Sequence, residues 1–448
     1  MTVRPHAFRT NGAPLAALLI LTGYAGAQTA SLTTLYEFKG PPDGANPSSG
    51  LVTDGAALYG TTVVGGIINT SEDQGRNGCG TVFALTPPAA PDGPWTEQIL
   101  HSFAGGADGC GPANGVVIGS GGVLYGTTSD GLIGGTAFSL TPPTTPAGPW
   151  TETVLYTFNG GCQSLHLIDC PPGGSFGAGP PYGLVIGKGG ALFGASFYGG
   201  AYCESAFGEA GCGAVFWLTP PLSPGGPWTE GFYSIGGGAL DGPDSGLALG
   251  GSGVLYGSTA YGGKYCCGAL FALAPPASPG ATWTQTLIHS FGNPNIREDG
   301  QTPGADVVID SSGVIYGITG SGGLGAGEVY SLTPPVSPGG DWTYAILYFP
   351  PSTPHGSGPS QLTLGPDGVL YSAVRQGGAS MQGTVFSLTP PASPGSAWTE
   401  TTLYIFTGGS DPFPNGGLLI GPGGLLFGTT AGAYPTPPNV GTVFVLEP

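Results

Sequence analysis

One six-residue phrase recurs seven times along this chain, and its clearest copy, Val123–Thr128, reads VLYGTT. The central aromatic residue of each copy is, in chain order, Tyr59, Tyr125, Phe193, Tyr256, Tyr316, Tyr371 and Phe427. Successive copies lie about 55 to 68 residues apart, and such a period indicates an array of identical supersecondary units. The repeat therefore predicts one continuous architecture, not the two or three separate domains that the length alone would suggest.

Each repeat contains four segments with the character of β-strands, as the second copy illustrates. Gly115–Ile118 is a short apolar run, and Val123–Thr128 follows it after a glycine-rich turn. Gly135–Thr141 alternates small polar with large apolar residues, which predicts a half-buried strand. Trp150–Phe158 is rich in β-branched and aromatic residues and follows a proline-rich connection that cannot pair.

Four short antiparallel strands, repeated seven times, predict an all-β fold, a seven-bladed β-propeller. We name the strands of each blade a to d, from the central axis outward. An open β-solenoid is the competing architecture, but it would need shorter, more uniform turns and capping units.

The two ends of the chain carry complementary pieces of one blade. Thr33–Phe38 matches a d strand, whereas the last blade, 417–446, ends on a c strand at Val443–Leu446. We expect the N-terminal strand to supply the missing d strand, because this pairing closes the ring and leaves no unpaired sheet edge.

The N-terminal segment lies outside the repeat and has the layout of a secretory signal peptide. A basic start is followed by the apolar run 14–24 and by the small residues 25–27. The run is shorter than the roughly 20 residues of a membrane span. We therefore expect residues 1–27 to be a signal peptide and residues 28–448 to form one propeller domain that is secreted, periplasmic or held at the cell surface.

The charge of the chain narrows its possible partners. It has 26 acidic residues against 8 Lys and Arg, with a formal net charge of −18. Such a surface repels phosphate backbones and anionic lipids, so we expect neither a nucleic-acid nor a membrane partner. No apolar stretch of membrane length follows residue 27, so we also expect no membrane span. We expect a monomer without a cofactor, whose partner is an extracellular glycan or protein.

The repeated phrases resemble a known bacterial family. LYGTT, the segment 383–391 (GTVFSLTPP) and WTE are similar to the GloVer tandem repeat of "choice-of-anchor" exported proteins, over essentially all of the mature chain. The resemblance implies a secreted or surface-displayed repeat protein. It carries over no catalytic residues, because no activity is established for the family. Members often end in an anchoring segment, and the ending Leu446–Pro448 without one favours release.

One face of the predicted propeller varies in sequence. The b–c loops and d–a crossings share that face and include the long segments 63–78, 159–182 and 197–211. Variable loops on a rigid scaffold commonly carry binding sites. The candidate ligand-binding residues there are Arg76, Tyr198, Tyr202, Tyr261, Lys264, Arg297, Asp306, Gln361 and Arg375. Asp306 and Gln361 stand where most a strands begin with Gly, beside the central channel; ordinary loop packing is the alternative role for the aromatic residues.

All cysteines fall on the same face. They are Cys79, Cys110, Cys162, Cys170, Cys203, Cys212, Cys266 and Cys267. An even number in an exported chain predicts disulfides. Nearness within a loop favours Cys162–Cys170 and Cys203–Cys212.

The other four cysteines leave more than one arrangement open. Cys79–Cys110 would join a b–c loop to the next crossing of the same blade. Cys266 and Cys267 are adjacent, so they form either a vicinal disulfide or bonds to other loops. We expect no metal site, because the C-x₂-C spacing and histidine partners of zinc are missing.

Aspartates recur in the d–a crossings. They are Asp43, Asp108, Asp241, Asp299 and, followed by Pro, Asp411. Calcium is one possible reason, but repeated Asx turns explain an Asp-Gly pair better than separate one-carboxylate sites. His101 and His289 replace the tyrosine of their d strands and are interpreted as framework residues.

These features favour a non-catalytic binding or adhesion propeller that recognises a glycan or another extracellular polymer. The alternative is a carbohydrate-active lyase or glycoside hydrolase on the same scaffold, which needs convergent acid and base groups. The charged candidates are scattered over several blades, so the sequence favours binding over catalysis.

Overall fold

The structure is a computed structural model that describes most of the chain. The described residues are 30–69, 77–90, 93–129, 135–145, 148–158, 182–197, 213–223, 225–235, 240–278, 281–296, 299–322, 327–337, 339–350, 359–378, 380–393, 395–408, 413–432 and 440–448. The predicted signal peptide lies outside these residues. Within them, no helix is long and apolar enough to cross a membrane.

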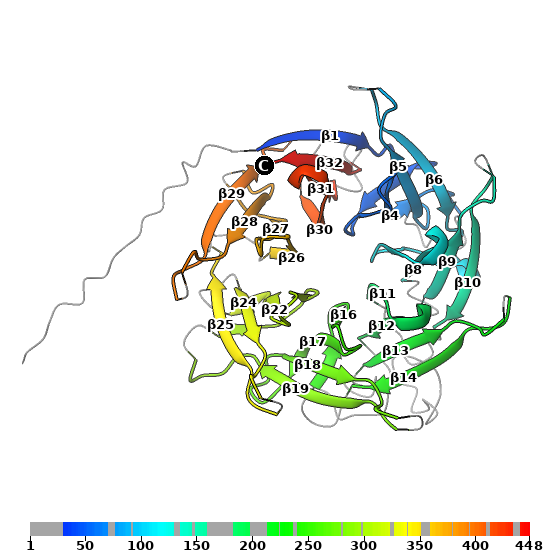
Figure 1. The fold of residues 1–448 in the computed structure, drawn as a ribbon. Coiled ribbons are helices and arrows are strands. Elements are labelled where there is room, and N and C mark those ends of the chain that lie inside the picture. Colours follow the sequence, from blue (N-terminus) through cyan, green and yellow to red (C-terminus); the bar gives the residue numbers. More distant parts are fainter. Residues whose placement is uncertain are drawn as a thin grey trace, which may run out of the picture.

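Seven blades of antiparallel strands form a ring around a central axis (Figure 1). Blade 1 contains β2 (Gly44–Pro47), β3 (Val52–Thr53), β4 (Leu58–Gly65), β5 (Thr81–Thr86) and β6 (Thr96–Ser102). Blade 2 contains β7 (Val116–Ile118), β8 (Leu124–Thr127), β9 (Thr136–Thr141) and β10 (Thr151–Thr157). Blade 3 contains β11 (Val185–Ile186), β12 (Leu192–Ser196), β13 (Ala214–Thr219) and β14 (Thr229–Ser234). Blade 4 contains β15 (Leu240–Pro243), β16 (Ala248–Leu249), β17 (Leu255–Gly262), β18 (Ala269–Ala274) and β19 (Thr284–Ser290).

The remaining blades follow the same plan. Blade 5 contains β21 (Val308–Ile309), β22 (Ile315–Ile318), β24 (Val329–Thr333) and β25 (Thr343–Tyr348), beside the small pair β20 (Gly300–Gln301) and β23 (Ser321–Gly322). Blade 6 contains β26 (Pro359–Leu364), β27 (Leu370–Val374), β28 (Thr384–Thr389) and β29 (Thr399–Ile405). Blade 7 contains β30 (Pro414–Ile420), β31 (Leu426–Thr430), β32 (Thr442–Glu447) and β1 (Ser31–Glu37). The described helical turns are η1 (Gly106–Asp108), η2 (Ser120–Gly122), η3 (Lys188–Gly190) and η4 (Pro422–Gly424).

The predicted closure of the ring is confirmed. The N-terminal strand β1 pairs antiparallel with β32, from Ser31 opposite Glu447 to Glu37 opposite Thr442. Figure 1 shows this blue strand lying along the red C-terminal strand. The amide of Phe38 continues the junction by donating to the Gly441 carbonyl at 3.1 Å. Blade 7 is therefore built from both ends of the chain.

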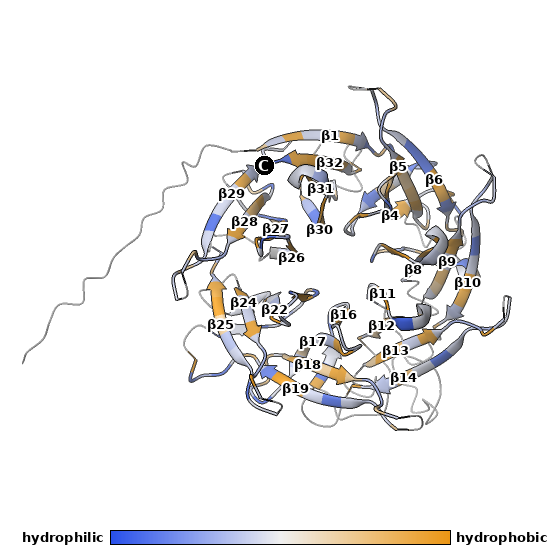
Figure 2. Ribbon diagram, in the orientation of Figure 1, coloured by the Kyte–Doolittle hydropathy of each residue, from blue (hydrophilic) through white to orange (hydrophobic). Residues whose placement is uncertain are grey.

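One strand prediction was wrong in its burial. The c strands were expected to be half-buried, but β9 is buried at five consecutive positions, and even Ser139 is only 7% exposed. Neighbouring blades cover both faces of a c strand, so its small polar residues lie inside the protein. The d strand β10 instead alternates between exposed and partly buried residues, because its outer face meets solvent. Figure 2 shows apolar segments on strands all around the ring.

The repeated phrase holds adjacent blades together. Tyr125 of VLYGTT packs edge-on against Trp228 of the next blade, with ring centroids 5.9 Å apart. Gly126 provides the bare backbone against which the ring of Phe138 lies, since a Cβ there would come within 2.5 Å of that ring. Phe158, at the end of the same blade, meets Phe216 of the following blade at 5.0 Å. The core is therefore a series of inter-blade clusters.

Candidate functional site

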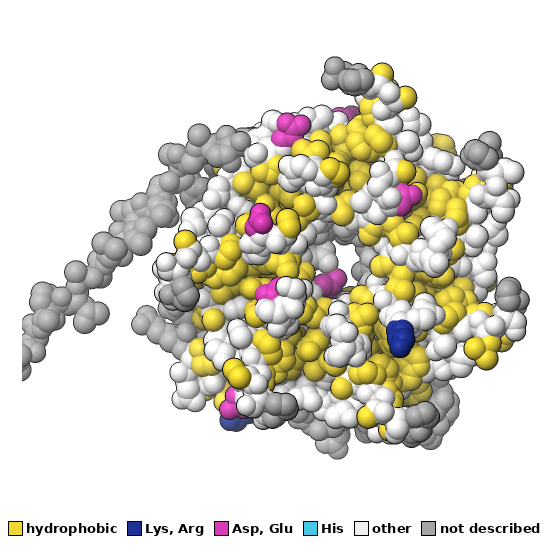
Figure 3. Space-filling model, viewed as in Figure 1, with side chains coloured by type: hydrophobic (Ala, Val, Ile, Leu, Met, Phe, Trp, Pro, Cys, Tyr) yellow, Lys and Arg dark blue, Asp and Glu magenta, His cyan; other side chains and the backbone are white. Residues whose placement is uncertain are grey.

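A cavity of about 510 Å³ lies on the axis of the ring. All seven blades contribute to its wall, through residues 48–52, 113–117, 182–185, 244–247, 304–306, 360–363 and 415–418. In blades 6 and 7 these segments lie within the innermost strands β26 and β30, and in blades 1 and 4 they lie between the two short strands that pair with the b strand. In blades 2, 3 and 5 they lie at or just before β7, β11 and β21. Figure 3 shows the opening at the centre of the ring, with acidic side chains near its margin. The cavity is therefore part of the axial channel, lined by the innermost strands of the blades.

Equivalent residues of the repeat form a closed circle around this cavity. Five blades place Gly at this position, namely Gly50, Gly115, Gly183, Gly246 and Gly417, while blades 5 and 6 place Asp306 and Gln361. Glycines let the backbone line the cavity without side chains. Asp306 and Gln361 therefore give the blade 5 and blade 6 side of the circle a carboxylate and an amide side chain, where the other blades present bare backbone.

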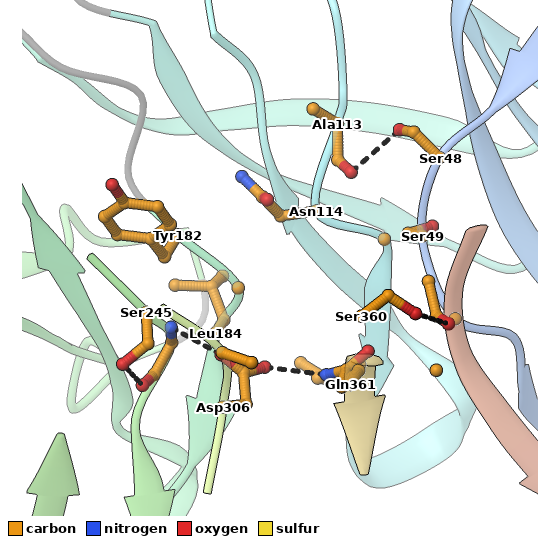
Figure 4. A pocket seen from close by; sticks show the side chains of 18 of the residues that line it. Ser48, Ser49, Ala113, Asn114, Tyr182, Leu184, Ser245, Asp306, Ser360 and Gln361 are labelled. Atoms are coloured by element: carbon orange, nitrogen blue, oxygen red, sulfur yellow. Dashed lines mark hydrogen bonds between the residues drawn. The ribbon is translucent and has the colours of Figure 1, made fainter. Parts of the chain in front are cut away.

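Asp306 is held between two neighbouring blades. Its Oδ1 accepts the backbone amide of Gly246 at 2.6 Å, and its Oδ2 accepts Nε2 of Gln361 at 2.9 Å. Figure 4 shows Asp306 and Gln361 pointing toward each other in the pocket. Burial raises the pKa of the Asp306 carboxyl, and the two hydrogen bonds partly oppose that shift. The side chain is a fixed hydrogen-bond acceptor, held from both sides.

A second carboxylate lines the wall at the junction of blades 3 and 4. The hydroxyl of Tyr182 donates to Asp244 Oδ1 at 2.8 Å. Burial also raises the pKa of Asp244, against the opposing effect of this hydrogen bond. A Cβ on Gly304 would lie 3.6 Å from the other oxygen, Oδ2. Asp244 is therefore close to the backbone two residues before Asp306.

Hydroxyl and amide groups complete the polar lining. Ser48 donates to the Ala113 carbonyl at 3.0 Å and so links blade 1 to blade 2. Ser360 similarly reaches the Gly416 carbonyl of blade 7 at 3.4 Å. Asn114 also lines the cavity, and Figure 4 shows it above the Asp306–Gln361 pair. None of the residues that line the described cavity is Lys or Arg.

The structure brings together only part of the predicted ligand site. Asp306 and Gln361 meet in the cavity. Tyr261 and Lys264 lie in and after β17, and Lys264 Nζ sits 5.1 Å from the ring centre of Tyr265. Arg375 is exposed just after β27 and does not line the cavity. Four further candidates lie outside the described residues, namely Arg76, Tyr198, Tyr202 and Arg297.

Sequence reasoning missed Asp244, Tyr182 and Asn114. All three lie one or two positions before the recurring Gly of an a strand. An alignment of the seven repeats at those positions would have shown them as variable polar residues. At the Gly position itself, only Asp306 and Gln361 depart from the repeat.

Two disulfides are present among the described cysteines. Cys79 bonds to Cys110, which is one of the arrangements that the sequence left open, with the Cα atoms 4.5 Å apart. Cys266 bonds to its neighbour Cys267, which settles the open alternative in favour of the vicinal pair. The four cysteines of the two favoured pairings lie outside the described residues, namely Cys162, Cys170, Cys203 and Cys212.

Asp43 and Asp108 stabilise their crossings, but not as Asx turns, and Asp411 lies outside the described residues. In such a turn the carboxylate accepts an amide two residues ahead. Asp43 instead accepts the amide of Lys39 at 2.9 Å, and Asp108 accepts that of Ala104 at 2.6 Å. The carboxylate thus reaches back to the end of the d strand. Nowhere in the described ranges do three His, Cys, Asp or Glu side chains gather as a metal site would require.

The two strand histidines have the expected framework role. His101 Nε2 lies 3.0 Å from Asp108 Oδ1, and His289 Nε2 lies 3.6 Å from Asp299 Oδ1. Tyr36 makes the equivalent contact, because its hydroxyl donates to Asp43 at 2.9 Å. A Tyr or His on the d strand thus recurs beside the crossing aspartate of the same connection.

The sequence model of the Gloeobacter/Verrucomicrobia repeat family matches residues 180–444, so the chain belongs to that family, as the repeated phrases indicated. No curated protein matches the chain.

Several solved structures share the propeller fold. The periplasmic gluconolactonase of Pseudomonas aeruginosa is 13% identical, with a TM-score of 0.51 over 83% of this chain and 95% of that one. A gluconolactonase from Xanthomonas campestris is 17% identical, with a TM-score of 0.37 over 77% and 86%. A protein of unknown function from Dyadobacter fermentans is 10% identical, with a TM-score of 0.44 over 93% and 99%. At these identities the likeness extends to the fold alone.

Proposed function

We propose that this member of the Gloeobacter/Verrucomicrobia repeat family is an exported binding propeller that holds one neutral sugar unit of an extracellular glycan in its axial cavity. The observation that carries the proposal is the fixed acceptor Asp306, which points into a polar cavity of about 510 Å³. Sites for small ligands commonly have volumes of roughly 300 to 1,000 Å³. A cavity of this size accommodates a sugar unit.

The chemistry of the lining supports a neutral, hydroxyl-rich ligand. Carboxylate oxygens accept strong hydrogen bonds from hydroxyl groups, and the amides of Asn114 and Gln361 can both donate and accept. Among the residues that the structure describes, the lining includes two carboxylates and no cationic side chain. With a formal net charge of −18, the protein repels sugar acids and sugar phosphates.

Export is part of the same proposal. The N-terminal segment has the layout of a signal peptide, and the Cys79–Cys110 disulfide is of the kind that persists outside the cytosol. A binding site for an extracellular polymer fits that location.

The test replaces both distinctive side chains with the glycine that the other blades carry. Binding of the mature protein is first screened on an array of neutral and acidic glycans, and the affinity for each bound glycan is then measured by calorimetry. The double variant Asp306→Gly, Gln361→Gly should bind at least about tenfold more weakly, because it loses two directed hydrogen bonds. Asp367→Asn, on an exposed a–b turn, is the matched control and should bind normally.

Two results would overturn the proposal. One is the absence of binding to any neutral glycan on the array. The other is unchanged affinity in a folded double variant, which would place the ligand elsewhere.

One observation favours catalysis as a second candidate function. Asp244 and Asp306 both line the cavity, burial raises the pKa of each carboxyl, and a pair of carboxyl groups can act as acid and base. Cleavage of a bound glycan, measured as new reducing ends or unsaturated products, would support a hydrolase or lyase. That activity would have to disappear in both Asp244→Asn and Asp306→Asn.

A further inference from the structure

We infer that the ring pair Phe197–Tyr261 is a second subsite, which stacks on the sugar next to the one in the axial cavity. The ligand is then a chain of neutral β-linked sugars whose equatorial hydroxyls leave a flat apolar face. This inference rests on the proposed function and extends it from one sugar unit to a polymer.

The position of Tyr261 connects it to the cavity. In blade 4, Tyr261 of β17 pairs with Asp241 of the innermost strand β15. Three residues further along the chain from Asp241 stands Asp244 of the cavity wall. Three residues of extended strand span about 10 Å. The ring therefore lies within reach of a sugar chain whose terminal unit occupies the cavity.

Phe197 lies beside the strand segment that connects Asp241, the partner of Tyr261, with Asp244 of the cavity wall. A Cβ on Gly242 would come within 2.9 Å of the Phe197 ring, so this ring rests on the bare backbone between Asp241 and Asp244. Gly242 also has a φ of +63°, a conformation that other residues adopt at a cost. The chain thus places an aromatic ring against the strand that leads into the cavity.

The two rings offer an apolar surface beside a polar cavity. Their planes are nearly perpendicular, at 88°, with centroids 6.4 Å apart. Tyr261 is 36% exposed, and Phe197 is partly exposed. Sugars present a similar division, since C–H groups form their flat faces and hydroxyls their edges. Aromatic faces attract the C–H groups, while the carboxylates of the cavity accept the hydroxyls.

The loop after Tyr261 is fixed before any ligand binds. The Gly268 amide donates to the Gly262 carbonyl at 3.2 Å, which closes the loop at its base. The Cys267 carbonyl accepts the amide of Thr302 at 2.8 Å and so ties the loop to the next crossing. The disulfide between Cys266 and Cys267 constrains the loop further. A rigid platform loses less entropy on binding.

The test compares chain lengths. Calorimetry measures the binding of glucose and xylose and of their β-1,4-linked hexamers, cellohexaose and xylohexaose, to the mature protein. At least one hexamer should bind about tenfold more tightly than its monomer. Tyr261→Ala should remove that gain without changing monomer binding, and Tyr261→Phe should retain it. Phe232→Ala, at an exposed ring on the outer strand β14, is the matched control and should bind like the parent.

The outcomes separate the two proposals. If neither monomer nor hexamer binds, both the sugar site and its extension are wrong. Binding that depends on Asp306 and Gln361 would support the sugar site in the cavity. If Tyr261→Ala then weakens the binding of monomer and hexamer equally, or weakens neither, the aromatic subsite is wrong.

Discussion

At the scale of single residues, the bare glycines of the axial circle matter as much as the two side chains that replace them. Asp306 and Gln361 fill the space beside Gly246 and Gly417, where a Cβ would come within 2.7 and 2.6 Å of their oxygens. Gly183 lies across the circle in blade 3, where the only described atom within 4 Å of a Cβ is the Asn114 carbonyl oxygen, at 3.5 Å. The circle is therefore asymmetric, with side chains in one arc and open space in another.

We predict that Gly183→Val blocks the proposed sugar site while the fold is retained. The added methyl groups would enter the cavity, and the backbone at this position does not have a positive φ. Glycan affinity measured by calorimetry should fall at least tenfold. The free energy of unfolding should change by no more than about 1 kcal/mol. Gly251→Val, where a Cβ meets no described atom within 4 Å, is the control, and equal binding by both variants would contradict the prediction.

A buried exchange in blade 5 shows how the repeat tolerates change. Glu328 stands where β9 has Thr136, and Tyr344 stands where β10 has Glu152. The Tyr344 hydroxyl donates to Glu328, which also accepts the amide of Gly300 at 2.9 Å. In blade 5 the buried acid therefore lies on the c strand instead of the d strand, and it has hydrogen-bond partners there.

At the scale of strands, a buried aromatic residue packs the junction of the two chain ends against the first blade. Phe38, immediately after β1, is 3% exposed and meets Phe83 of blade 1 at 5.1 Å between ring centroids. The same contact type joins Phe158 to Phe216, so the closing junction uses the packing of ordinary blade boundaries.

We predict that Phe38→Ala weakens the whole ring. Removing a buried Phe side chain commonly costs about 3 to 5 kcal/mol, because apolar contacts are lost and a cavity remains. Urea unfolding should show a loss of that size. Thr33→Ala, at an exposed position of β1, should change stability by no more than about 0.5 kcal/mol. Equal stabilities of the two variants would show that the closing strand contributes little.

At the scale of the whole molecule, carboxylates lie partly buried at the boundaries between blades. Glu97 of β6 faces Asp43 and Tyr36 across the junction of blades 1 and 7. Burial, and then the negative charge of Asp43, raises the pKa of Glu97 to about 7. Burial likewise raises the pKa values of Glu152 and Glu230. Similar groups therefore recur around the ring.

These groups predict a fold that is more stable in mild acid. A carboxyl whose pKa is higher in the folded than in the unfolded protein stabilises the fold below the unfolded pKa, near 4.5 for Glu. That contribution is lost as the pH rises from about 4.5 through 7. The thermal midpoint should therefore be higher at pH 5 than at pH 8, and Glu97→Gln should reduce the difference. A midpoint that rises between these two pH values would contradict this explanation.

Strong acid should reverse the trend. Backbone and side-chain hydrogen bonds lower the pKa values of Asp54 and Asp310, although burial opposes the shift. A carboxyl with a lowered pKa stabilises the fold above its unfolded pKa, and that contribution is lost as the pH falls through its folded value. Stability should therefore pass through a maximum in mildly acidic solution.

The sequence by itself determined the propeller, because a blade is encoded locally. Period-two alternation, the central aromatic residue of each b strand and the prolines after each c strand lie within one repeat. They predicted the strands of blade 2 to within one residue at each end, as for Val123–Thr128 against Leu124–Thr127 in the structure. The closing strand was predictable too, since β1 carries the pattern of a d strand.

Only the tertiary structure decided which side chains meet on the axis. Gln361 bonds to Asp306 across 55 residues, and Tyr182 bonds to Asp244 across 62. No local pattern encodes such contacts, because they depend on the radius at which seven packed blades close. That radius results from inter-blade packing around the entire ring, so each repeat specifies its own blade, while the cavity is a property of the closed circle.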